Sequence, residues 1–148
     1  MFYLLLTMLL CGEDQYLKNK IDQDTELGQD TEIFNGNIIK TKTYNKGAFL
    51  SFLEGKTAVL HGLSIILLAI VAVTYICTLL SKGKNVLKLG LSLLTAGAMS
   101  NVYDRLKRGH VIDYFSFKGL RNVVFNIGDM FIFLGSILIL FRELLKRD

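Results

Sequence analysis

Long stretches without charge dominate the pattern of hydrophobic and polar positions along this chain. The longest runs from Thr57 to Leu80 and contains no Asp, Glu, Lys or Arg. At ~1.5 Å of rise per residue, a helix over this run would be roughly 36 Å long and would exceed the ~30 Å hydrocarbon core of a bilayer. The run therefore predicts a transmembrane helix.

Two further segments fit a membrane span less strictly. Residues 86–106 are apolar except for Lys88 near one end and an Asp-Arg pair near the other. The segment Phe125–Phe141 contains a single charge, Asp129. Because charges near the ends of a span can reach the interface, both segments remain candidates for membrane helices.

The amino-terminal stretch is uncharged up to Gly12, yet twelve residues rise only ~18 Å as a helix. It lacks the basic leader and small-residue cleavage site of a signal peptide. Leu10 is too bulky for a lipoprotein box that ends at Cys11. We interpret the stretch as a short first helix that continues toward Leu17 and Ile21. A start codon assigned too far downstream would also explain why the helix is short.

The predicted fold is an all-α membrane protein with one domain over residues 1–148. Four spans, at about 1–20, 57–80, 86–106 and 125–145, leave extracytoplasmic segments at about 21–56 and 107–124. Lys82, Lys84 and Lys88 flank the link between the second and third spans, so the positive-inside rule places this link and both termini in the cytoplasm. Basic residues after the third span weaken this bias. Cys11 and Cys77 would lie on opposite sides of the bilayer, too far apart for a disulfide.

The segments outside the spans carry weaker signals. Ile38–Tyr44 alternates apolar or β-branched residues with lysines and predicts a strand, followed by a turn at Asn45-Lys46-Gly47. Residues 107–122 are too polar to cross a membrane and too aromatic for a free linker. We expect them to form a loop or helix on the outer membrane surface.

Composition agrees with this picture. The chain is 51 % hydrophobic and 20 % charged, with a mean hydropathy of +0.42. These values exclude a disordered protein, a collagen-like repeat and a disulfide-stapled secreted module. The net charge of +4 does not indicate nucleic acid, because the basic residues flank spans, where anionic headgroups attract them.

Ionisable and amide side chains gather at the outer ends of the apolar segments, where a carboxylate costs several kcal/mol unless it is paired or hydrated. Asp113 and Asp129 are lone carboxylates among bulky apolar residues and are the candidates for function. Asp104 beside Arg105 also fits a structural ion pair, and Asn126 also fits a helix cap. The full set is Asn101, Asp104, Arg105, Asp113, Asn126 and Asp129.

Other catalytic classes find no support in the sequence. His61 and His110 are single residues without metal-ligand spacing, and Ser100 and Ser116 have no His or Lys partner in a recognisable arrangement. Two carboxylates indicate aspartic chemistry, in which the pair shares one proton, activates a water and polarises a carbonyl. Such a site would hydrolyse a peptide bond presented at the membrane surface, without a metal or cofactor.

Five short blocks of this chain resemble, in order, those of the signal peptidase II (lipoprotein signal peptidase) family. Each block alone is weak, whereas the ordered set between four spans is specific. Gly128 stands where the family usually has Ala, and Tyr114 where Phe is usual. The blocks are Asp14-Gln15-x-x-Lys18, Asn45-Lys46-Gly47-Ala48-Phe49, Asn101-Val102-Tyr103-Asp104-Arg105, Val111-Ile112-Asp113-Tyr114 and Phe125-Asn126-Ile127-Gly128-Asp129.

The resemblance implies a four-span aspartic peptidase of the bacterial inner membrane. It would remove the signal peptide from a prolipoprotein, cleaving just before a diacylglyceryl-modified cysteine, with Asp113 and Asp129 as the catalytic pair. It also implies a β-cradle on the membrane surface and inhibition by globomycin; we expect contact with membrane lipid and a monomer. The residues that would bind substrate or support the pair are Asp14, Lys18, Asn45, Gly47, Phe49, Asn101, Asp104, Arg105 and Asn126.

One hypothesis concerns access to this site. The segment Asn45–Leu53, with Gly47 as a hinge and with Phe49 and Phe52, would form a flap over a lateral opening between the helices. Two other interpretations of the chain stay open, a catalytically inactive homologue and a small transport or scaffolding protein. A transporter would need polar residues facing each other at mid-membrane, whereas these residues cluster at one end.

Overall fold

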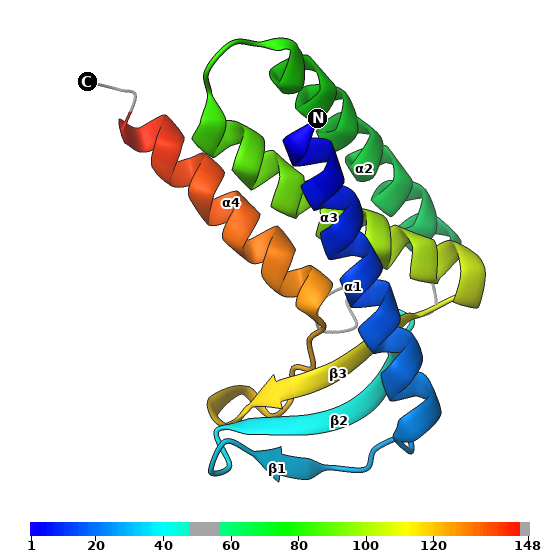
Figure 1. Ribbon diagram of the computed structural model, residues 1–148. Coiled ribbons are helices and arrows are strands. Elements are labelled where there is room, and N and C mark those ends of the chain that lie inside the picture. Colours follow the sequence, from blue (N-terminus) through cyan, green and yellow to red (C-terminus); the bar gives the residue numbers. More distant parts are fainter. Residues whose placement is uncertain (48–56, 146–148) are drawn as a thin grey trace.

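The computed structural model describes residues 1–47 and 57–145. In these residues, helices lie side by side and a small antiparallel sheet lies at one end of them (Figure 1). The elements are α1 (Phe2–Asp24), β1 (Thr31–Ile33), β2 (Ile38–Asn45), α2 (Thr57–Leu80), α3 (Asn85–Arg108), β3 (Val111–Phe117), the short 3-10 helix η2 (Lys118–Leu120) and α4 (Ile127–Leu145).

The α-helices lie where the apolar segments predicted them, with small shifts at their ends. The helix α2 has the predicted bounds. The helix α1 continues past residue 20 to Asp24, which is the extension toward Ile21 that the short apolar stretch required. The helix α4 begins at Ile127 rather than 125, because Asn126 serves as the cap of its first turn.

The helices carry apolar side chains on the outside and polar side chains within. Among the described helices, α2 alone is long and apolar enough to cross a membrane by composition, and only 11 % of its most apolar window is buried. Leu9 of α1 and Phe133 of α4 are more than half exposed, whereas Asp14 of α1 and Ser100 of α3 are fully buried. Polar residues that face the interior thus contribute to the lower hydropathy of α1 and α3.

The helix α3 packs against α1, α2 and α4, and it approaches α4 most closely at glycines. A Cβ added to Gly97 would lie 2.1 Å from the carbonyl oxygen of Gly128, and a Cβ added to Gly135 would lie 2.5 Å from that of Gly90. Neither contact leaves room for a side chain. These glycines therefore set the separation of the two helices, as small residues do in packed membrane helices.

A second set of contacts, made by buried hydroxyl groups, connects α1, α2 and α3. Tyr75 Oη lies 2.9 Å from Thr7 Oγ1 and 2.9 Å from Ser92 Oγ, and all three side chains are buried. Hydrogen bonds of this kind hold helices together where neighbouring lipid offers no polar partner.

The sheet has the order β1-β2-β3, with antiparallel pairs. The strand predicted at Ile38–Tyr44 is confirmed and extends to Asn45. In contrast, β3 replaces the loop or helix expected within residues 107–122, so the chain is mostly rather than wholly helical. The sequence of β3 shows no clear alternation because successive residues on both of its faces, from Val111 to Tyr114, are buried.

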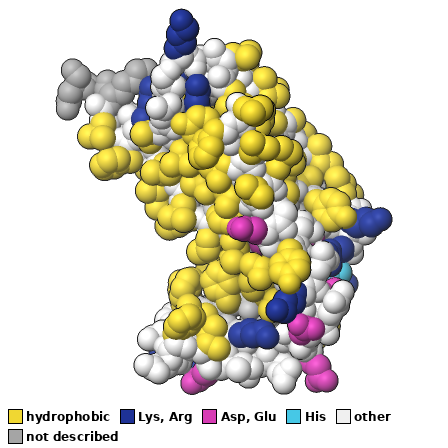
Figure 2. Space-filling view, in the orientation of Figure 1, with side chains coloured by type: hydrophobic (Ala, Val, Ile, Leu, Met, Phe, Trp, Pro, Cys, Tyr) yellow, Lys and Arg dark blue, Asp and Glu magenta, His cyan; other side chains and the backbone are white. Residues whose placement is uncertain are grey.

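The surface reflects this division of the fold. Figure 2 shows hydrophobic side chains covering the helical part, while charged side chains gather over the sheet and at the far end of the helices. The outline is indented on the left between the helical part and the sheet, with hydrophobic side chains above and below this indentation and an acidic side chain at its level.

Candidate active site

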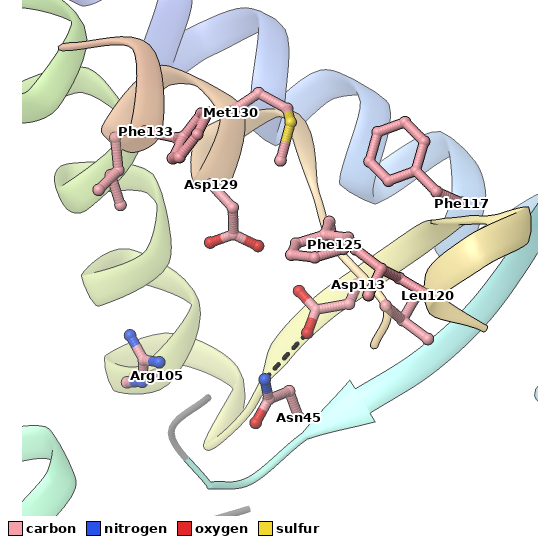
Figure 3. Close-up of a pocket in the computed structure, with 11 residues that line it drawn as sticks. Asn45, Arg105, Asp113, Phe117, Leu120, Phe125, Asp129, Met130 and Phe133 are labelled. Carbon is pink, nitrogen blue, oxygen red and sulfur yellow. Dashed lines mark hydrogen bonds between the residues drawn. The ribbon is translucent and has the colours of Figure 1, made fainter. Parts of the chain in front are cut away.

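Asp113 and Asp129 come from different elements and line one pocket. Asp113 lies on β3 and is 3 % exposed, and Asp129 lies in the first turn of α4. Figure 3 shows both carboxyl groups pointing into the same space, with Asn45 and Arg105 at its edge. The pocket has a volume of about 600 Å³, and the rest of its wall is apolar: Phe117, Leu120, Val124, Phe125, Met130, Ile132 and Phe133.

Both oxygens of Asp113 accept hydrogen bonds from amide side chains. Asn45 Nδ2 donates to Asp113 Oδ2 at 2.9 Å, and Asn126 Nδ2 donates to Asp113 Oδ1 at 2.6 Å. These two bonds hold the carboxyl group in one orientation at the end of the pocket.

Both oxygens of Asp129 are held as well. Asn101 Nδ2 donates to Asp129 Oδ1 at 2.8 Å, and the backbone N–H of Asn126 donates to Asp129 Oδ2 at 3.1 Å. Asn126 therefore binds both carboxylates, one through its side chain and the other through its backbone.

Each of the three amides has a fixed direction, because its oxygen is already occupied. Asn45 Oδ1 accepts from the backbone N–H of Gly47 at 3.1 Å, and Asn101 Oδ1 accepts from Lys18 Nζ at 2.8 Å. Asn126 Oδ1 accepts from the backbone N–H of Asp129 at 2.9 Å. Their NH₂ groups must therefore face the two carboxylates.

The end of α3 and the pairing of β3 determine the position of Asp113. Gly109 ends α3 in the left-handed conformation, with φ 76°, and its N–H bonds to the carbonyl of Arg105. The strand β3 then pairs with β2. In this register Asp113 lies opposite Thr43, and Asn45, two residues further along β2, donates to its carboxyl group.

A backbone contact brings the start of α4 to the same place. Phe125 bonds back to Phe115 through its N–H at 2.7 Å and its carbonyl at 3.0 Å. Asn126 follows directly and comes within reach of Asp113. Asn126 and Asp129 then form a reciprocal capping pair, the arrangement that begins many helices.

The environment of Asp113 favours its protonated form. Burial, followed by repulsion from Asp129, raises the pKa of Asp113 to about 7, and the hydrogen bonds from Asn45 and Asn126 oppose the shift. A neighbouring pair of carboxyl groups with such a shift holds one proton near neutral pH. This is the protonation state that aspartic hydrolysis requires.

A buried cation supports the site from α1. Lys18 Nζ lies 2.8 Å from Asp14 Oδ2 and 3.1 Å from Asp104 Oδ2, and all three side chains are fully buried. The ammonium also donates to Ser100 Oγ at 3.1 Å and to Asn101 Oδ1. Its charge offsets the buried carboxylate of Asp14 and contributes, together with Arg108, to offsetting that of Asp104.

The expected ion pair between Asp104 and Arg105 is wrong, because Asp104 pairs with other basic residues. Asp104 pairs with Lys18 and with Arg108, whose Nε lies 3.1 Å from Asp104 Oδ1. Neighbouring residues on a helix point about 100° apart, so Arg105 faces the pocket instead. Its buried Nε has no hydrogen-bond partner among the described residues.

Three further residues, outside the predicted set, also support the site. Ser100, for which the sequence shows no His or Lys partner in a recognisable arrangement, accepts from Lys18 and donates to Asp14 Oδ2 at 2.5 Å; it is fully buried and lies outside the pocket, so it is no nucleophile. Gln15 donates to Asp104 Oδ1, and Tyr114 donates to Asp14 Oδ1. The motif blocks that contain Gln15 and Tyr114 could have suggested these two residues, but all of the contacts except those within one helix join segments that are distant in sequence.

The remaining predicted site residues divide into two groups. Gly47 lies beside Asn45 and donates to it, as a turn residue. Phe49 and most of the predicted flap lie outside the described residues. Among the described residues, no group of three or more His, Cys, Asp or Glu could hold a metal ion.

Comparisons with known proteins, by family model, by sequence and by structure, agree with one another. A family model described as Signal peptidase (SPase) II matches residues 6–145. Lipoprotein signal peptidases of Lactiplantibacillus plantarum and Enterococcus faecalis are 36 % and 33 % identical to this chain; each alignment covers 93 % of it, and 91 % and 84 % of the relatives. Two solved bacterial membrane enzyme structures superpose with TM-scores of 0.84 and 0.83 at 25 % and 26 % identity, covering 97 % and 99 % of this chain and 87 % and 94 % of theirs.

Proposed function

Because this chain belongs to the signal peptidase II family, we propose that it removes signal peptides from prolipoproteins, with Asp113 and Asp129 as its catalytic pair. The bond cleaved is the peptide bond just before a diacylglyceryl-modified cysteine. One observation carries the assignment of the pair: two buried carboxyl groups from separate elements face one pocket, each held by two donors.

The pair acts through one shared proton. The ionised carboxylate takes a proton from a water as the water oxygen attacks the carbonyl carbon of the scissile bond, and the protonated carboxyl group donates to the carbonyl oxygen. The tetrahedral intermediate then collapses, the C–N bond breaks, and a proton passes to the leaving nitrogen. Asn45, Asn101 and Asn126 hold the two carboxyl groups in position through these steps.

The pocket suits a substrate with both a peptide and a lipid part. Its polar end contains the pair and Arg105, whose guanidinium can donate to backbone carbonyls of the signal peptide. Its apolar wall, which includes Phe117, Leu120 and Phe133, can receive an acyl chain or apolar side chains of the substrate. The scissile bond would thus reach the carboxyl groups while the acyl chains stay in an apolar environment.

The site lies on the extracytoplasmic side in this proposal. All four α-helices cross the bacterial cytoplasmic membrane, and both termini are cytoplasmic. Figure 1 supports a common side, because α1 begins and α4 ends at the same end of the helices, away from the sheet. The sheet then forms the cradle at the outer surface, where an exported prolipoprotein arrives. The enzyme acts as a monomer and binds globomycin in the same pocket.

The two other interpretations are less well supported. The buried charged and amide side chains gather at the sheet end of α1, α3 and α4, and the second buried polar set, Thr7, Tyr75 and Ser92, carries only hydroxyls, which does not favour a transport path through the middle of the membrane. An inactive homologue would have no need of two carboxyl groups held open to a pocket by oriented amides.

The test uses purified protein and a diacylglyceryl-modified prolipoprotein. We expect Asp113→Asn and Asp129→Asn each to lower the cleavage rate by at least about 10³-fold, because either change removes a proton-transfer group. Asp30→Asn, which changes an exposed carboxylate outside the site, should keep the wild-type rate. Unimpaired cleavage by either site variant would contradict the assignment of the pair, and wild-type cleavage without lipid modification would contradict the substrate class.

A further inference from the structure

Tyr114 and Gly128, which lie beside the proposed catalytic pair without belonging to it, contact the same carboxylate. Tyr114 Oη donates to Asp14 Oδ1 at 3.4 Å, and the backbone N–H of Gly128 donates to the same oxygen at 3.0 Å. Asp14 is fully buried. The two residues therefore meet at one oxygen atom.

Gly128 leaves the space that Asp14 occupies. A Cβ added at Gly128 would lie 2.7 Å from Asp14 Oδ2 and 2.9 Å from Asn126 Oδ1. Asp14 cannot withdraw freely, because its Oδ2 accepts from Ser100 at 2.5 Å and pairs with Lys18 at 2.8 Å. In the present geometry, alanine at this position would force the carboxylate to move.

Tyr114 completes the attachment of α4. Its hydroxyl accepts from the backbone N–H of Ile127 at 3.1 Å, in addition to its bond to Asp14. The first N–H groups of a helix have no partner within the helix, so Tyr114 and Asp14 supply the acceptors that Ile127 and Gly128 need. Burial raises the pKa of Tyr114, which keeps the hydroxyl protonated and able to donate. Asp129 follows Gly128 directly in the chain, so these contacts hold the backbone next to Asp129.

We propose that Tyr114 and Gly128 are coupled positioning residues, which together seat Asp14 against the first turn of α4 and thereby fix the Asp129 carboxylate. Asp14 also pairs with Lys18, whose ammonium holds the Asn101 amide in the direction that serves Asp129. A displaced Asp14 would thus disturb both the backbone and the side-chain support of Asp129. This role rests on the proposed function.

The test is a double-mutant cycle with Tyr114→Phe, Gly128→Ala and the double variant, in which kcat, KM and the unfolding midpoint are measured in detergent. Two matched controls change the same residue types elsewhere. Tyr44→Phe removes a hydroxyl that donates to Asp22 Oδ1 at 2.7 Å outside the pocket, and Gly62→Ala adds a Cβ with no atom within 4 Å. Both controls should keep the wild-type kcat.

We expect each single variant to lower kcat roughly five- to tenfold with KM within about twofold of wild type, because a small misplacement of a reacting group slows chemistry more than it weakens binding. In the double variant the hydroxyl that holds Asp14 Oδ1 is absent as well, so Asp14 can settle in another position and make room for the added Cβ. Its kcat should exceed that of Gly128→Ala alone. A Gly128→Ala chain that unfolds while the double variant folds would support the coupling in the same way.

Three results would overturn the inference. The first is a wild-type kcat in the single variants. The second is a double variant whose loss of kcat equals the product of the two single losses within about twofold. The third is a Tyr114→Phe variant that loses stability without losing kcat. If the wild-type protein cleaves no prolipoprotein, the proposed function fails instead. The coupling is then judged from the unfolding midpoints, where non-additive shifts support the shared contact at Asp14 and additive shifts reject it.

Discussion

Asn126 and Asp129 hold each other at the start of α4. The backbone N–H of Asp129 donates to Asn126 Oδ1 at 2.9 Å, and the backbone N–H of Asn126 donates to Asp129 Oδ2 at 3.1 Å. The remaining donor of Asn126, Nδ2, binds Asp113. One residue thus caps the helix and links the two carboxyl groups of the site.

Variants of Asn126 should separate these two roles. Asn126→Ser keeps an N-cap oxygen, so we expect the free energy of unfolding to change by less than about 0.5 kcal/mol, while the loss of the amide donor to Asp113 lowers kcat at least about tenfold. Asn126→Ala should lose the same activity and a further ~1 kcal/mol of stability. Thermal unfolding and cleavage kinetics measure both effects. Wild-type kcat in the serine variant would contradict the link to Asp113.

The pH dependence of cleavage should follow the proton of the pair. Because the pKa of Asp113 is raised to about 7, the pair keeps its proton below this pH and loses it above, so kcat/KM should fall as the pH rises through about 7. The hydrogen bond from Asn45 lowers this pKa. Asn45→Ala should therefore move the alkaline limb of the profile to higher pH, whereas Asn37→Ala, on an exposed turn, should not. A shift to lower pH would contradict the assignment.

Removing the buried cation should destabilise the fold. Lys18→Met leaves Asp14 and Asp104 buried without their shared partner, and we expect a loss of ~3–5 kcal/mol in the free energy of unfolding. Arg121→Met is the control, because Arg121 pairs with Glu32 at the surface, where both side chains are more than half exposed, and should contribute about 1 kcal/mol or less. Equal losses in the two variants would show that the Lys18 cluster is not the support we describe.

The close contact between α3 and α4 predicts a sharp dependence on glycine. Gly97→Ala places a Cβ against the carbonyl of Gly128, so we expect a loss of ~1–3 kcal/mol or more in stability. Activity should fall as well, because Asn101 and Asp129 lie on the two helices that are forced apart. Gly62→Ala, in open space on α2, should leave both unchanged. Unfolding midpoints that match for the two variants would contradict the glycine contact.

The sequence predicted those features that depend on local pattern. The lack of charge from Thr57 to Leu80 predicted α2 to the residue, and the isolation of Asp113 and Asp129 among apolar residues predicted the candidate pair. It failed where long-range contacts decide. Asp104 pairs with Lys18, which lies on a different helix, rather than with its neighbour in sequence. No local pattern carries that information.

The strand β3 shows the same limit in another form. A strand buried on both faces loses the alternation by which strands are recognised, so the pattern of these residues predicts a surface loop or helix instead. Asp113 could be singled out from its apolar neighbours, and the family resemblance named Asn45 and Asn126 as supporting residues, but no local pattern shows that they donate to Asp113. Asn45 reaches it only because β2 pairs with β3.

The fixed direction of the three amides has a consequence for turnover. Since Gly47, Lys18 and Asp129 occupy the oxygens of Asn45, Asn101 and Asn126, respectively, the donors face the carboxyl groups before any substrate arrives. The entropy of orienting them is lost once, when the chain folds, and not again in each catalytic cycle. The site is therefore preorganised, because the donors to the two carboxyl groups need no reorientation when the substrate binds.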